Sequence, residues 1–355
     1  MRFLPLLAGF GLAACSPGGS AATPALEAGD PPATAAAADP RSETRTFRDW
    51  IAICDNGDAC SAYGQGEDGF GWIRVAMAAG PDARPEVAAG RWPDDGAEAG
   101  PLTLTIDMTE YPLTLAKDAD AATAAPAQAL EVVRALADGA TARIGPDQAI
   151  SLSGAAAAML WIDERQGRVN TVTALRRPGS QPASSVPEAP ALPVVTPARA
   201  VAQTGFGGQK PALPAALEAV PAVAACRTET GDHWAANQVM SARLDASTEL
   251  WAVPCFVGAY NIGHDWYVTG PGGRDPRPAR LSSSSGEVTA STINGGYSPE
   301  TRTLSAFAKG RGIGDCGVAS TWTWTGRAFV LTSEQEMSEC WGIPAERWPT
   351  TWRTR

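Results

Sequence analysis

Cysteine spacing is the feature that most restricts how this chain can fold. The chain has seven cysteines. Cys15 closes an apolar N-terminal run, and the other six form neighbouring pairs along the sequence: Cys54–Cys60, Cys226–Cys255 and Cys316–Cys340. An even number of cysteines in an exported chain predicts disulfides. Six cysteines allow many connectivities. We predict the sequential one, because each bridge then closes a modest loop and stabilises the fold by roughly 2–4 kcal/mol.

The N-terminus indicates export. Arg2 is followed by the apolar run Leu4–Ala14, which is too short to cross a bilayer and ends in small residues, as signal peptides do. Leu12-Ala13-Ala14-Cys15 resembles the lipobox of bacterial lipoproteins, so we predict cleavage after residue 14 and a lipid (palmitate) anchor on Cys15. The alternative is an ordinary secretory peptide. Ser16, in place of an aspartate, favours the periplasmic side of the outer membrane.

Composition excludes several classes of function. The net charge is −10 and the pI is about 4.8, which argues against a nucleic-acid partner, since such a protein needs a basic face. The chain has two histidines and no CxxC motif, so the rival interpretation of the cysteines as zinc ligands is weak. We therefore predict no metal site and no cofactor.

The distribution of proline, alanine and aromatic residues predicts two domains. Residues 15–45 lack aromatic residues and are expected to form a flexible tether, because they cannot bury enough apolar surface to fold. Residues 46–178 are expected to form a small α+β domain, and residues 226–355 a mostly antiparallel β domain. A Pro/Ala-rich linker over residues 179–225 would join them.

Local patterns predict individual elements. Pro126–Ala137 is expected to be helical, with apolar residues on one face, and Ser153 is expected to cap a second helix. Val169–Leu175 is typical of a strand. Thr321–Thr325 alternates threonine with tryptophan, which predicts a strand that places Trp322 and Trp324 on one face, followed by a hairpin turn.

Four segments together resemble one family of exported proteobacterial proteins, the domain-of-unknown-function family eleven-seventy-six. The resemblance covers most of residues 46–355, and its first segment is also similar to invasion-associated locus B proteins. It implies an envelope location and these cysteines, but no activity and no catalytic residues. The segments are Phe47-Arg48-Asp49-Trp50 through Cys54-Asp55-Asn56 and Cys60; Gln166-Gly167-Arg168-Val169; Pro254–Asn261; and Lys309–Gly317.

The glycine-rich loop Lys309–Gly317 contains the candidate ligand-binding residues Lys309, Arg311 and Asp315. Glycine-rich backbone with nearby cations can hold an anion or an acidic glycan. The alternative, which we favour, is a structural turn in which Asp315 pairs with Arg311 and accepts hydrogen bonds from backbone donors.

The histidines and acidic pairs are expected to lie at the surface. His233 and His264 each adjoin an aspartate, but adjacent residues rarely point toward each other as a general base requires. Acidic pairs such as Asp163-Glu164 are interpreted as solvated surface.

The tryptophans are expected to divide between core and surface. Trp322 and Trp324 are assigned to the β core. Trp341, Trp348 and Trp352 are expected to form a partly exposed patch that could contact an envelope glycan or protein.

The function that these patterns favour is a non-enzymatic binding or structural module of the cell envelope. The alternative is a hydrolase of envelope polysaccharide, which needs two carboxylates in one aromatic-lined cleft. Asp265 or Asp315 beside an exposed tryptophan, with a second acid about 5–10 Å away, would favour the hydrolase. Acids that are dispersed or paired with arginines would favour binding.

Overall fold

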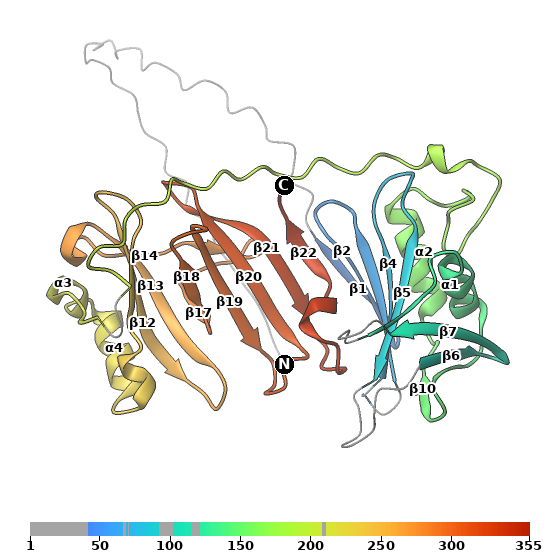
Figure 1. Ribbon diagram of the computed structural model, residues 1–355, viewed down its shortest axis with the longest axis horizontal. Coiled ribbons are helices and arrows are strands. Elements are labelled where there is room, and N and C mark those ends of the chain that lie inside the picture. The colour runs from blue at the N-terminus through green and yellow to red at the C-terminus, as the bar shows by residue number, and fades with distance from the viewer. Residues whose placement is uncertain (1–41, 67–68, 70, 92–101, 116–120, 208–210) are drawn as a thin grey trace, which may run out of the picture. The chain divides into compact units, whose positions relative to one another are not determined.

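The computed structural model describes residues 42–66, 69, 71–91, 102–115, 121–207 and 211–355. The predicted signal peptide, Cys15 and most of the predicted tether lie outside these residues. Pro40–Arg355 forms one compact unit, which is mostly antiparallel β-structure (Figure 1).

The first sheet has ten strands among the described residues, in the order β1-β2-β3-β4-β5-β8-β7-β6-β9-β10. The strands are β1 (Glu43–Phe47), β2 (Trp50–Cys54), β3 (Cys60–Gln65), β4 (Gly71–Met77), β5 (Pro85–Arg91), β6 (Leu102–Ile106), β7 (Thr109–Leu115), β8 (Ala122–Ala124), β9 (Ala142–Ile144) and β10 (Gln148–Ile150). A bridge between Gly66 and Ile150 brings β10 back to the end of β3.

Strand β2 is buried on both faces. Trp50, Ala52 and Cys54 join one apolar cluster, while Ile51 and Ile53 join another. Since successive side chains of a strand point to opposite faces, this sheet must be covered on both sides along β2.

Two helices, α1 (Ala129–Asp138) and α2 (Ala155–Arg165), lie on one face of this sheet (Figure 1). The predicted helix over 126–137 is confirmed in type and begins three residues later, because residues 125–128 form a turn. The second helix is confirmed too, but Gly154 and not Ser153 is its N-cap.

The predicted strand Val169–Leu175 is wrong. This segment is made of turns, with one bridge between Thr171 and Gln181. Its Leu175 N–H donates to a buried Asp163 carboxylate instead of to a neighbouring strand, and this side-chain acceptor replaces a β ladder.

The C-terminal part contains two five-stranded sheets and one two-stranded sheet among the described residues. The first comprises β11 (Met240–Arg243), β12 (Glu249–Val257), β13 (Ile262–Thr269), β14 (Arg277–Pro278) and β17 (Ser291–Ile293). β15 (Leu281–Ser282) pairs with β16 (Val288–Thr289). The other comprises β18 (Gly296–Ser298), β19 (Thr303–Lys309), β20 (Gly317–Trp324), β21 (Phe329–Met337) and β22 (Thr350–Arg353). The helices α3 (Ala215–Glu218) and α4 (Pro221–Thr230) precede these strands.

The core of this part contains the predicted tryptophans. Trp322 and Trp324 are 5% and 4% exposed, and both pack in a cluster with Leu250, Trp266 and Leu304. The two larger sheets therefore share one apolar core. The hairpin predicted after Thr325 is confirmed as the turn between β20 and β21.

All six cysteines lie in bonded pairs that match the predicted connectivity. Cys54–Cys60 joins β2 to β3, Cys226–Cys255 joins α4 to β12, and Cys316–Cys340 joins the segment before β20 to the segment after β21. Each bridge connects elements that are already close in sequence.

A further apolar cluster combines residues from both predicted domains. Ile51, Tyr63 and Trp72 pack with Trp341 and Trp348. The expected exposed tryptophan patch is wrong for Trp341 and Trp348, which are 8% and 2% exposed because they cover the second face of the first sheet. The division into two domains near residues 179–225 stays a prediction.

Candidate functional site

The glycine-rich loop Lys309–Gly317 is closed by an ion pair. Arg311 donates from Nε to one carboxylate oxygen of Asp315 at 2.7 Å and from Nη2 to the other. Asp315 also accepts from the Gly342 N–H at 2.7 Å, and Arg311 donates to the Cys340 carbonyl at 3.0 Å. The pair therefore joins this loop to the segment on the other side of the disulfide.

The electrostatics of the loop favour a structural role. Burial opposes ionisation of Asp315, but the Arg311 guanidinium and the Gly342 N–H outweigh it, so the pKa of Asp315 is lowered. Lys309, the third candidate, lies apart from the pair, with its ammonium 5.9 Å from the centre of the Phe307 ring. The structure thus pairs two of the three candidates with each other and engages the Nε and Nη2 donors of Arg311 within the protein.

The first motif segment makes hydrogen bonds to the last strand, β22. Asp55 accepts from the Gly57 and Ala59 N–H groups through one carboxylate oxygen, and from Arg353 Nε through the other. The Asn56 side chain donates to the Arg353 carbonyl and accepts from the Arg353 N–H, both at 2.9 Å. These residues hold β22 beside the disulfide-closed turn after β2.

The second motif segment forms a buried polar network. Arg168 is fully buried and donates to Gln166 Oε1, Thr173 Oγ1 and the carbonyls of Ala78 and Gly80. The network fixes the end of α2 against the end of β4.

Asp163 corrects the surface interpretation of the acidic pairs. It is fully buried and accepts three N–H groups, from Leu175, Arg176 and Arg177. Burial raises its pKa, although these donors and the charge of Arg168 oppose the rise. Glu164 is exposed as expected.

The third and fourth motif segments meet at Asn261. Its amide donates to the Lys309 carbonyl at 3.0 Å, and its Oδ1 accepts from Asn294, which also donates to the Phe307 carbonyl. Asn294 has a positive φ of 49°, a conformation that asparagine tolerates. These amides join the β12–β13 hairpin to β19. The motif segments therefore supply many of the hydrogen bonds that connect distant parts of the chain.

The surface prediction is wrong for His264. It lies in β13 and is 5% exposed, and burial lowers its pKa, so the imidazole is neutral. His233 is exposed and accepts from the Ala235 N–H at a 3₁₀-helix N-terminus.

Two clusters among the described residues combine a carboxylate with a cysteine pair. Asp265 lies beside Cys226 and Cys255, and Asp315 lies beside Cys316 and Cys340. Both pairs are disulfides, and a disulfide lacks the thiolate that binds a metal. Neither cluster in this oxidised form is a metal-binding set.

A groove lies between β15–β17 on one side and β19–β21 on the other. Its volume is about 530 Å³, within the range of small-molecule sites. Its walls are mainly aliphatic, and hydroxyls and two acids, one exposed and one buried, complete the lining. The lining includes Leu281, Val288, Ile293, Ala306, Ala308, Val318 and Trp322, with Ser283, Glu287, Thr289, Ser291, Thr292, Ser320 and Glu334.

The buried acid of the groove, Glu334, is already satisfied. It is 3% exposed and accepts from the Ser284 N–H and from the hydroxyls of Ser320 and Thr351, at 3.0–3.1 Å. Three donors already occupy this carboxylate, so it is held in place by the protein. The groove therefore offers shape and apolar surface more than acid–base chemistry.

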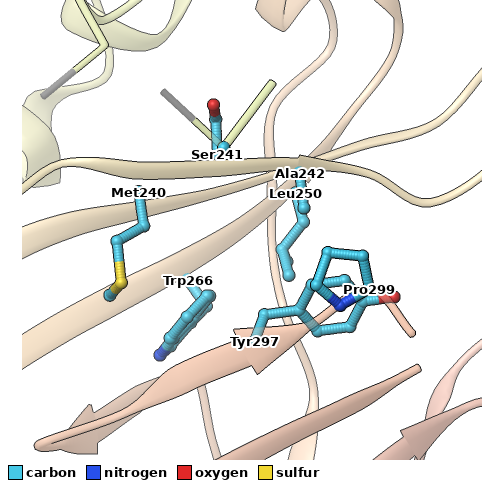
Figure 2. Close-up of a pocket in the computed structure, with 8 residues that line it drawn as sticks. Met240, Ser241, Ala242, Leu250, Trp266, Tyr297 and Pro299 are labelled. Atoms are coloured by element: carbon cyan, nitrogen blue, oxygen red, sulfur yellow. The ribbon is translucent and has the colours of Figure 1, made fainter. Parts of the chain in front are cut away.

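A second cavity, of about 330 Å³, lies beside the core. Figure 2 shows Met240 and Leu250 extending from their strands toward Trp266 and Tyr297. Among the described residues the Tyr297 hydroxyl is buried without a hydrogen-bond partner, and burial raises the pKa of Tyr297 to about 12. The phenol thus remains a neutral donor.

The fold and the groove define a class: a disulfide-clamped antiparallel β protein with an aliphatic groove between its strands. The chain belongs to the family described as "Protein of unknown function (DUF1176)", whose model matches residues 44–355. It is 31% identical over 345 residues to "Uncharacterized protein YpfG" of Escherichia coli (strain K12), covering 88% of this chain and 93% of that protein. The family expected from the four motif segments is confirmed. The similarity to invasion-associated locus B proteins stays a prediction.

No solved structure matches this chain. Within the described residues, none of the helices combines the length and the apolar character that crossing a bilayer requires.

Proposed function

We propose that this protein is a non-enzymatic lipoprotein of the cell envelope that faces the periplasm and binds an amphipathic molecule with an aliphatic chain. The observation that supports the proposal is the groove, whose walls are aliphatic while hydroxyls lie among its lining residues. Such a distribution suits a ligand with an apolar chain and a polar end.

The charged residues that line the groove restrict the class of ligand further. Glu287 is exposed and lines the groove, and no Lys or Arg is among the described residues that line it. An anionic head group would be repelled. We therefore favour a ligand with a neutral head group.

Hydrolysis is the weaker alternative. Asp315 is paired with Arg311, and Asp265 accepts from Ser291 beside a disulfide. Glu334 is held by three donors. Acids engaged in this way favour a binding module over a pair of carboxylates that exchange protons with a substrate.

Filling the groove tests the binding proposal. Ala308 lines the groove, whereas the exposed Ser305 lies on the opposite face of β19, since the two differ by an odd number of positions. In the full chain carrying Cys15→Ser, Ala308→Phe should weaken binding of monopalmitoylglycerol at least about tenfold, and Ser305→Phe should leave it unchanged, by titration calorimetry. Palmitate should bind less tightly than monopalmitoylglycerol. Equal affinities of the two variants, or no binding to the unfilled groove, would contradict the proposal.

The proposed anchor has its own test. The lipobox-like segment Leu12–Cys15 supports lipidation, and Ser16 supports the outer membrane. Cys15→Ser should shift the protein from the detergent phase to the soluble periplasmic fraction or leave an uncleaved precursor. Phase partitioning and intact-mass measurement check this. Partitioning that stays the same in the variant would refute the anchor without affecting the groove.

A further inference from the structure

A small pocket with three arginines lies at one end of the C-terminal sheets. Its volume is about 210 Å³. Arg277 comes from β14, Arg280 follows that strand, and Arg327 lies in the turn between β20 and β21. The apolar part of the lining includes Val268, Trp324 and Phe329.

These three arginines are uncompensated. Within the described part of the chain, none of their guanidinium groups makes an ion pair or hydrogen bond, and the pocket lining contains no acid. Elsewhere arginines such as Arg165 and Arg353 are paired with carboxylates. In a chain with 38 acidic and 28 basic residues, three unpaired cations around one hollow repel one another and attract an anion.

Trp324 forms part of the apolar lining of the pocket. Trp324 is 4% exposed, and its indole N–H is buried without a partner among the described residues. Leaving such a donor unpaired costs free energy. Because this N–H is buried, a ligand in the pocket contacts the indole ring and not this donor.

We propose that this pocket binds a phosphate-bearing ligand. Guanidinium groups bind phosphate through paired, charge-assisted hydrogen bonds. Three guanidinium groups line this pocket. They match a phosphate, which has several free oxygens, better than a carboxylate, which has two. The apolar floor suits the ring or chain that carries the phosphate. This site is separate from the aliphatic groove, and neither proposal depends on the other.

The test uses the full chain with Cys15→Ser and three probes: inorganic phosphate, glucose 1-phosphate, and vesicles of phosphatidylglycerol. Glucose and phosphatidylcholine vesicles are the uncharged or zwitterionic controls. Arg280→Ala and Arg327→Ala should each weaken binding of the phosphate-bearing probe about tenfold. Added salt should weaken binding to the unsubstituted pocket.

Arg274→Ala is the matched control. Arg274 is an exposed arginine on the segment leading to β14, outside the pocket, and its Nε–H donates to the Pro271 carbonyl. This variant should bind like the unsubstituted protein, and all variants should keep the same melting temperature, since exposed arginines without a carboxylate partner stabilise little. Ala308→Phe should also leave phosphate binding intact.

The outcomes separate the sources of the phosphate. Binding of glucose 1-phosphate or inorganic phosphate identifies a soluble ligand, and binding of phosphatidylglycerol vesicles alone identifies a lipid head group. Both support the pocket if Arg280→Ala reduces binding and Arg274→Ala does not. Failure of all three probes, or equal losses in Arg280→Ala and Arg274→Ala, would overturn the proposal.

Discussion

Arg168→Ala is expected to lower the free energy of unfolding by about 3–5 kcal/mol. Arg168 is fully buried and donates to Gln166, Thr173 and two backbone carbonyls, so its loss leaves buried acceptors unsatisfied. The positive charge of Arg168 also opposes the rise in the pKa of Asp163 that burial causes, so it favours the ionised carboxylate. Without it, that carboxylate is a buried charge with backbone donors only.

Urea denaturation followed by circular dichroism measures this loss. Arg176→Ala is the control, because Arg176 belongs to the same segment and makes a surface ion pair with Asp138 at 2.7 Å. An exposed pair of this kind contributes about 0–1 kcal/mol. If Arg168→Ala were no less stable than Arg176→Ala, the buried network would not be the structural centre that its contacts indicate.

Asp315→Asn is expected to destabilise the protein by about 2–3 kcal/mol at neutral pH. The amide cannot accept two charge-assisted hydrogen bonds from Arg311, and its N–H₂ group faces one of those donors. Removing the charge also weakens the link to Gly342 across the disulfide. Asp232→Asn, at an exposed aspartate, should be nearly neutral.

The effect of Asp315→Asn depends on pH in a defined direction. Because the pKa of Asp315 is lowered in the folded protein, its ionised form stabilises the fold at pH values above the ordinary aspartate pKa. This contribution is lost as the pH falls through the lowered folded-state pKa. The stability difference between the unsubstituted protein and Asp315→Asn should therefore shrink below about pH 4. A difference independent of pH from 7 to about 2 would contradict the ion pair.

Local sequence signals predicted much of the fold. The cysteine connectivity followed from short loops, and the strand with Trp322 and Trp324 followed from strict alternation. The pairing of Arg311 with Asp315 was the favoured alternative for the glycine-rich loop, and these two residues are four positions apart. These features depend on residues that are close in the chain.

Features that depend on distant residues were missed. Asp163 and His264 look like surface residues locally. Asp163 is buried against residues 175–177, which lie 12 to 14 positions further along the chain, and the His264 ring contacts the Gln238 carbonyl, 26 positions earlier. Trp341 and Trp348 are buried because they cover β2 and its neighbours, almost three hundred positions earlier. The groove and the arginine pocket were also missed. One sequence signal for the groove is the pair of small residues Ala306 and Ala308, which leaves space on one face of β19.

The most direct test of the binding proposal is native mass spectrometry of the protein purified in a mild detergent from the cells that produce it naturally. We expect the unsubstituted protein to carry a non-covalent ligand with an aliphatic chain, and the Ala308→Phe variant to lack it while Ser305→Phe retains it. Detection of the unsubstituted protein without a ligand, or of the same ligand on Ala308→Phe, would contradict the assignment of the groove as the binding site.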